Sequence, residues 1–165
     1  MEAYHQNDFH FREISPADDA AVAGLVRSNL EQAGLAIPGT AYFDAALDHL
    51  NTVYGRADSR YFVLEDQEGR VVGGIGFAPF APWPETAELQ KLYLDDKVKG
   101  AGLGYFMIQF IEAQMRQAGF QRSYLETHDR LAAAVHIYRK SGYREIPRPE
   151  AVGHSTMNLF FMKDL

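Results

Sequence analysis

The chain contains no cysteine, and this absence excludes several kinds of chemistry. Without a thiol there is no disulfide, no cysteine nucleophile and no thiolate-bound metal. Long apolar segments are also missing, because no hydrophobic run approaches the roughly 18 residues that cross a bilayer. Residues 1–8 are too polar for a signal peptide, so we expect a cytoplasmic protein.

Positive charge is scarce as well. The chain has 16 Lys and Arg against 22 Asp and Glu, a formal net charge of −6. This balance disfavours nucleic acid and anionic membrane as partners and mildly favours a cationic amine substrate. A chain of 165 residues with 47% hydrophobic content suits one domain, residues 1–165, with a core from about residue 9 to 163. A homodimer is left open.

Apolar periodicity predicts the element order β-α-α-β-β-β-α-β-α-β-β, with mixed rather than purely parallel pairing. Ser15 and Pro16 are typical of a helix start, and Gly34 ends that helix. A second helix is expected from Thr40 to Tyr54, with Phe43 on its buried face. The predicted strands cover residues 9–14, 60–65, 70–77, 87–94, 122–127, 143–146 and 155–162.

The most informative segment is the turn Lys99–Gly104, called the glycine turn below, which joins a strand to an amphipathic helix. Bare backbone N–H groups at the start of a helix, together with its macrodipole, favour a phosphate. The following helix has one apolar stripe, consisting of Leu103, Phe106, Met107, Phe110, Ile111 and Met115.

Spacing excludes two common phosphate loops at this turn. A Walker A loop needs its lysine after the glycines, whereas Lys99 precedes them. A dinucleotide fingerprint needs a third glycine where Tyr105 stands, and the residues after Gly104 are too few for the rest of a doubly wound sheet.

The remaining pattern, Lys99-x-x-Gly102-x-Gly104, resembles the Gln/Arg-x-x-Gly-x-Gly/Ala motif of the GNAT acetyltransferases. A second segment, Ala134-x-x-Ile137-Tyr138-x-Lys140-x-Gly142-Tyr143, is similar to that family's Ala-x-x-Leu-Tyr-x-x-x-Gly-Phe. The chain departs from many members at Leu131, where they have a cofactor-binding Asn.

The resemblance covers essentially the whole chain. It implies an α/β GNAT fold, with a mostly antiparallel mixed sheet flanked by helices, and acetyl-CoA as the co-substrate. The residues it assigns to acetyl-CoA are Leu92, Tyr93 and Leu94 on the strand, and Lys99, Gly100, Ala101, Gly102, Leu103, Gly104 and Tyr105 at the turn.

Acetyl transfer to an amine needs a base and an acid. The resemblance implies Glu88 as the base, because some family members have a catalytic glutamate six residues before the strand's last residue, here Leu94. A glutamate entering a buried strand end also has its pKa raised by desolvation; a solvated strand-end glutamate is the alternative. Glu126 is a competing base, and Gln90 is placed to position water or substrate. Tyr138 is the predicted general acid for the thiolate, although its helix face also permits a plain core tyrosine.

The acceptor is less well defined. The six histidines show no metal-ligand spacing, so no metal is expected. The predicted function is N-acetyltransfer to a small-molecule primary amine by direct attack on the thioester. Acetylation of protein N-termini or lysines, and a non-catalytic acyl-CoA-binding module, remain alternatives. Weaker candidate acceptor contacts, each more readily explained by packing or solvation, are Tyr42, Phe43, Asp44, Asp48, Trp83 and His154.

Overall fold

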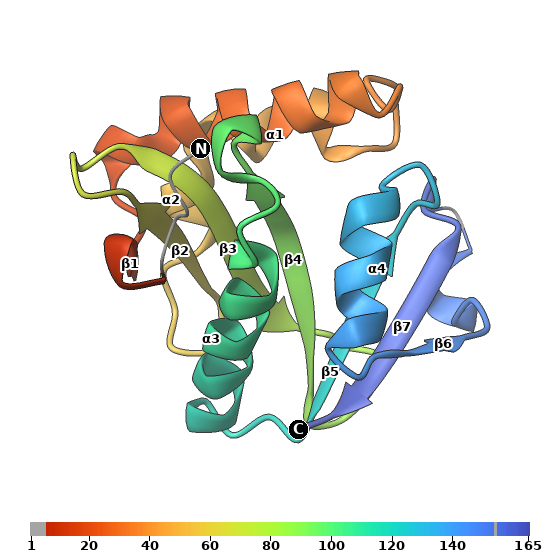
Figure 1. Ribbon diagram of the computed structural model, residues 1–165. Coiled ribbons are helices and arrows are strands. Elements are labelled where there is room, and N and C mark those ends of the chain that lie inside the picture. The colour runs from red at the N-terminus through yellow and green to blue at the C-terminus, as the bar shows by residue number, and fades with distance from the viewer. Residues whose placement is uncertain (1–5, 154) are drawn as a thin grey trace.

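A seven-stranded sheet forms the centre of the computed structural model, which describes residues 6–153 and 155–165 (Figure 1). Its strand order is β1-β2-β3-β4-β5-β7-β6, and only the β4–β5 pair is parallel. The strands are β1 His10–Glu13, β2 Arg60–Glu65, β3 Val71–Pro79, β4 Thr86–Leu94, β5 Arg122–Thr127, β6 Arg144–Ile146 and β7 Leu159–Asp164.

Four α-helices flank the sheet, with α3 and α4 together on one face (Figure 1). They are α1 Asp19–Gln32, α2 Leu50–Val53, α3 Leu103–Gln117 and α4 Ala132–Lys140. The predicted element order and the mixed, mostly antiparallel sheet are therefore confirmed.

Side-chain alternation along β2 explains why both faces of the sheet are covered. Tyr61 and Val63 belong to the core cluster that contains the buried α1 residues. Phe62 and Leu64 point the other way, into the cluster that contains the α3 stripe. Because successive strand side chains face opposite sides, this buried strand needs a helix on each side.

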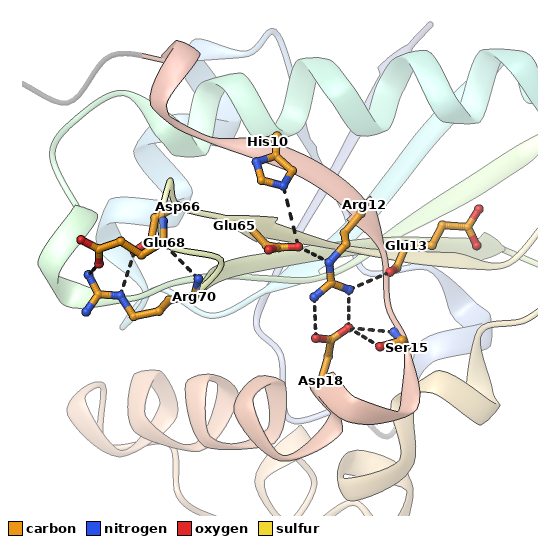
Figure 2. A network of polar contacts seen from close by, with 9 residues as sticks. All are labelled: His10, Arg12, Glu13, Ser15, Asp18, Glu65, Asp66, Glu68 and Arg70. Atoms are coloured by element: carbon orange, nitrogen blue, oxygen red, sulfur yellow. Dashed lines mark hydrogen bonds and ion pairs between the residues drawn. The ribbon is translucent and has the colours of Figure 1, made fainter.

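A polar network fixes the start of α1 against the sheet (Figure 2). The guanidinium of Arg12 on β1 donates to both carboxylate oxygens of Asp18, at 2.6 and 2.7 Å, and also to Glu65 on β2. The backbone N–H of Ser15 donates to Asp18 at 2.8 Å, as the predicted helix start requires. The network joins two strands to the first turn of a 3₁₀ segment that leads into α1.

The prediction of one continuous helix from Thr40 to Tyr54 is wrong. Two 3₁₀ turns, Ala41–Phe43 and Ala45–His49, precede the short α2. Asp44 interrupts the helix because its backbone is extended and its carboxylate caps the next turn, accepting from the Ala46 N–H at 3.0 Å. Phe43, predicted to be buried, is 62% exposed. The last strand also begins later than predicted, at Leu159 rather than Ser155.

The parallel pair β4–β5 separates soon after it forms. Only three residue pairs join the strands, ending at Glu88 opposite Tyr124. We call the point just beyond this pair the fork. From Leu89 to Leu94, β4 has no hydrogen-bonded strand on that side, and its other edge stays paired with β3.

Candidate active site

A cavity of about 510 Å³ opens where β4 and β5 separate. It brings together most of the residues predicted to bind acetyl-CoA, which come from β4 and from the start of α3. Tyr138, the predicted acid on α4, also lines it. The predicted residues in its lining are Leu92, Tyr93, Leu94, Lys99, Gly100, Gly102, Leu103, Gly104 and Tyr138; Ala101 and Tyr105 are outside it.

The glycine turn has the geometry that a phosphate requires. Gly100 and Gly102 have φ values of +85° and +76°, which L side chains rarely adopt, and open space surrounds the position of a Cβ at either residue. Gly102 is the N-cap of α3, and no side chain caps it. The first N–H groups of α3 therefore remain available to an anion in the cavity. This arrangement fits the pyrophosphate of acetyl-CoA.

Gly104, the last residue of the glycine turn, also allows two helices to pack closely. A Cβ there would lie 2.7 Å from Cδ1 of Ile137, so the missing side chain lets α3 and α4 approach each other closely. Lys99 forms an ion pair with Asp96, with 2.7 Å between Nζ and the carboxylate. This pair holds a cation beside the turn.

Strand β4 contains an irregularity at the cavity. Its register with β3 shifts between Gly74 and Gly76, and Lys91 has the left-handed φ of +52°. The hydroxyl of Tyr61 donates to the Lys91 carbonyl at 2.8 Å. The bulge turns the Lys91 carbonyl away from the regular ladder, and a buried side chain satisfies it.

Glu88 is the last β4 residue paired with β5, and both Glu88 and Gln90 lie outside the cavity lining. Burial raises the pKa of Glu88 to about 7, and the nearby carboxylate of Glu126 adds to the rise. A hydrogen bond from Gln90 and the charge of Lys91 oppose it. A carboxylate with this pKa is half deprotonated at neutral pH, which is the condition a general base needs.

Glu126, the competing base, has its oxygens engaged. It accepts from the Tyr124 hydroxyl at 2.9 Å and from the Ser155 hydroxyl at 3.2 Å. It lines the cavity as well. Both oxygens of Glu126 therefore already accept a hydrogen bond within the protein, and we keep Glu88 as the candidate base.

Tyr138 is 6% exposed and packs against Tyr143 and Phe161. Burial raises its pKa well above the usual value, so the phenol is protonated at neutral pH. Tyr138 belongs to the α3-side cluster together with Ala87 and Leu89. Glu88 lies between these two in β4 and points to the opposite face. The candidate acid and base therefore approach the fork from the two faces of the sheet.

The weaker acceptor candidates do not line the cavity. Asp48 pairs with Arg27 at 2.9 Å, and Tyr42 donates to Glu31. Trp83 packs on Phe80 and Tyr124 away from the lining. Lining residues to which the sequence patterns gave no site role include Asn29, Thr40, Ala41, Lys91, Thr127, Arg130 and Met157; His154 lies outside the described residues.

One of these residues, Lys91, could have been noticed in the sequence, and Leu131 was already identified there as a departure from the family. Lys91 is the only charged residue in the segment Leu89–Leu94, where burial is the default. Leu131 lines the cavity at the N-cap of α4, and no side chain caps that helix. Asn29 could not have been noticed in this way, because its amide reaches the Leu94 carbonyl (3.0 Å) from a helix distant in sequence.

Within the described part of the chain, no three His, Asp or Glu side chains gather closely enough to hold a metal ion. Over the same residues, no helix is both long and apolar enough to cross a membrane.

A sheet divided at a parallel pair, with a glycine-rich helix start beside the opening, is the arrangement that the sequence resemblance predicts for an acyl-CoA-dependent acyltransferase. The model of the acetyltransferase (GNAT) family matches residues 28–143, well over half of the chain. The chain belongs to this family and is an N-acetyltransferase.

Curated relatives agree with this assignment. The uncharacterized N-acetyltransferase YjgM of Escherichia coli K12 is 36% identical over 137 residues, covering 82% of this chain and 81% of that protein. Streptothricin acetyltransferase of Streptomyces lavendulae is 24% identical and covers 87% and 85% of the two chains.

Solved structures share the fold at low sequence identity. A GNAT acetyltransferase from Staphylococcus aureus Mu50 has a TM-score of 0.84 at 17% identity, covering 95% of this chain and 99% of that one. PaiA N-acetyltransferase from Thermoplasma acidophilum, in complex with coenzyme A, has a TM-score of 0.75 at 17% identity, with coverages of 95% and 99%.

Proposed function

We propose that this protein transfers an acetyl group from acetyl-CoA to the primary amine of a small molecule. The observation that carries the proposal is the arrangement around the fork: Tyr138 and the glycine turn line one cavity, and Glu88 lies at the last β4–β5 pair with its side chain on the opposite face of the sheet. Binding, proton removal and proton donation then have separate groups in one site.

The glycine turn anchors the co-substrate. Backbone N–H groups at the start of α3 bind the pyrophosphate, and the unpaired edge of β4 from Leu92 to Leu94 runs along the pantetheine arm. A backbone N–H of this strand polarises the thioester carbonyl as charge develops on its oxygen. Leu131 offers no polar contact where many family members have Asn.

Glu88 takes the proton that the acceptor ammonium must lose, directly or through a water. The neutral amine then attacks the thioester carbon, forming the N–C bond as the C–S bond breaks. Tyr138 donates its phenolic proton to the departing thiolate, and the second proton, which the nitrogen loses as the amide forms, restores the phenol through solvent. The raised pKa of Tyr138 keeps the proton in place until the thiolate forms.

A small-molecule acceptor is supported by streptothricin acetyltransferase, whose name gives a small molecule as its substrate. The test measures thiol release from acetyl-CoA with amino acids, polyamines, aminoglycosides and peptides as acceptors. Thiol release that depends on a small amine supports the proposal. Release with peptides alone identifies a protein acetyltransferase, and CoA binding without any release identifies a binding module.

A further inference from the structure

Lys91 is a cavity residue to which the proposed mechanism gives no role. Four charged residues line the cavity, and three of them have partners. Lys99 pairs with Asp96, Arg130 donates to the Gly34 carbonyl at 3.0 Å, and Glu126 accepts from two hydroxyls. Among the described residues, no carboxylate lies within the 4.0 Å ion-pair distance of the Lys91 ammonium.

The groups around Lys91 compensate its charge only in part. Its Nζ lies 6.0 Å from the centroid of the Tyr54 ring. Burial lowers the pKa of Lys91, while the more distant charges of Asp44 and Glu88 favour its protonated form. Glu88 itself is only half ionised near neutral pH. A half-buried cation in this setting gains from an anion that enters the cavity.

The fold holds Lys91 in this position by several independent contacts. Its left-handed backbone is fixed by the hydroxyl of Tyr61, which is 1% exposed. The Tyr61 ring fits only because β3 has glycine beneath it. A Cβ at Gly74 would lie 2.8 Å from Cε1 of the ring, and one at Gly76 would lie 2.5 Å from Cδ2. The base of this lysine is therefore rigid, as a specificity contact requires.

We propose that Lys91 binds a carboxylate of the acceptor, so that the acceptor is an amino acid. The inference rests on the proposed acetyl transfer. It follows from the unpaired ammonium at one point of β4 and the candidate base three residues earlier on the same strand. An amino acid carries its amine and carboxylate close together, and can direct one to Glu88 and the other to Lys91.

The charge of the cavity supports this substrate class against a polyamine. Its charged lining residues are Lys91, Lys99 and Arg130 against Glu126, and the half-ionised Glu88 lies outside the lining. The net charge of −6 of the whole chain, which mildly favours a cationic acceptor, is therefore not repeated at the site. A polycation would meet like charge beside the acetyl group.

The test uses matched acceptors that differ only at the carboxylate. Initial rates of thiol release are measured with the proteinogenic L-amino acids and with their carboxamides, in the wild type and in Lys91→Met, Lys91→Arg and Arg116→Met. Lys91→Met keeps the chain length and removes the charge, and Lys91→Arg restores a cation. Arg116→Met removes an exposed cation near the far end of α3.

We expect the wild type to prefer at least one amino acid over its carboxamide by about tenfold or more, the scale of one charge-assisted contact. Lys91→Met should raise the KM for that amino acid by about 10- to 100-fold more than the KM for its carboxamide, because the changed charge beside Glu88 affects both acceptors alike. Lys91→Arg should recover part of the loss, and Arg116→Met should behave as wild type. A wild type that prefers carboxamides or polyamines, or a Lys91→Met enzyme that keeps the preference, overturns the proposal.

Failure of acetyl transfer itself gives a different result. If the wild type releases no thiol with any acceptor, titration calorimetry of the amino acids into the CoA-bound protein tests Lys91 without catalysis. Binding that is lost in Lys91→Met and kept in Lys91→Arg supports the carboxylate site, although the enzymatic proposal has failed. Equal binding, or none, in all variants overturns the Lys91 assignment.

Discussion

At the scale of single residues, the pKa of Glu88 links catalysis to stability. Because the folded protein raises this pKa from 4.5 to about 7, the folded state holds the proton more tightly than the unfolded chain. Stability therefore falls as pH rises between these two values, by an amount on the order of 3 kcal/mol. The candidate base lowers the stability of the fold at the pH where it works.

Replacing Glu88 by Gln should separate the two effects. We expect kcat to fall by about 10²-fold or more, because the amide accepts no proton. The acidic limb of the wild-type pH–rate profile, with its midpoint near 7, should disappear. The free energy of unfolding should rise above that of the wild type at pH 8 and match it at pH 4. A variant that retains the wild-type profile would assign the base role to Glu126, for which Glu126→Gln is the comparison.

Tyr138→Phe removes one oxygen and leaves the packed ring, so the fold and CoA affinity should barely change. We expect the single-turnover rate of acetyl transfer to fall by about 10²-fold, because the thiolate loses its proton donor. Rapid-quench measurement is the proper readout, since slow product release hides such a loss in the steady state. An unchanged single-turnover rate would leave Tyr138 as a core residue.

At the scale of elements, the left-handed backbone of Gly102 at the start of α3 exposes the N–H groups that we propose bind CoA. Gly102→Ala should weaken CoA binding about tenfold or more in titration calorimetry, because a Cβ disturbs the N–H groups that face the phosphate. Gly119→Ala is the matched control: this residue has a φ of +94°, no atoms near its Cβ position, and lies beyond the other end of the same helix. Equal loss in both variants would mean that helix strain, rather than phosphate binding, is responsible.

The stability that the Arg12–Asp18 pair gives to the contact between β1 and the start of α1 should be lost at acidic pH. Arg12 holds the pKa of Asp18 below its usual value, so the pair stabilises the fold above pH 4 and the effect is lost as pH falls through the lowered pKa. Asp18→Asn should lower the free energy of unfolding by about 1–3 kcal/mol at pH 7 in urea titrations, with the difference shrinking below pH 4. Asp48→Asn, which breaks a solvent-exposed pair with Arg27, should change the free energy of unfolding far less, because solvent screens that pair.

Elements that depend on residues within one segment could be predicted from the sequence. Features that depend on contacts between residues far apart in the sequence could not. The strand, glycine turn and helix through Leu103–Gln117 follow from spacing within one segment. The apolar spacing after Thr40 predicts one continuous helix, whereas Asp44 caps a new turn there and interrupts it. The Lys91 bulge depends on Tyr61, thirty residues earlier, and no local pattern contains that contact.

At the scale of the whole molecule, the sheet is continuous only through the three residue pairs before the fork. A bound co-substrate should join the two parts beyond it. CoA at 100 times its Kd should therefore stabilise the protein by about 2.7 kcal/mol in thermal unfolding. Hydrogen exchange should slow at Leu89–Leu94 and at the start of α3, and stay unchanged in β2. Uniform slowing across all strands would contradict binding at the fork.

The three residue pairs before the fork are also the point about which β4 could rotate relative to β5. The part of β4 that is not paired with β5, Leu89–Leu94, is about 20 Å long, so a rotation of about 5° would displace its far end by about 2 Å. The same rotation moves Glu88 by almost nothing. Any such rotation would therefore widen the cavity mainly near the glycine turn, the end at which a long ligand would enter, and leave Glu88 almost in place.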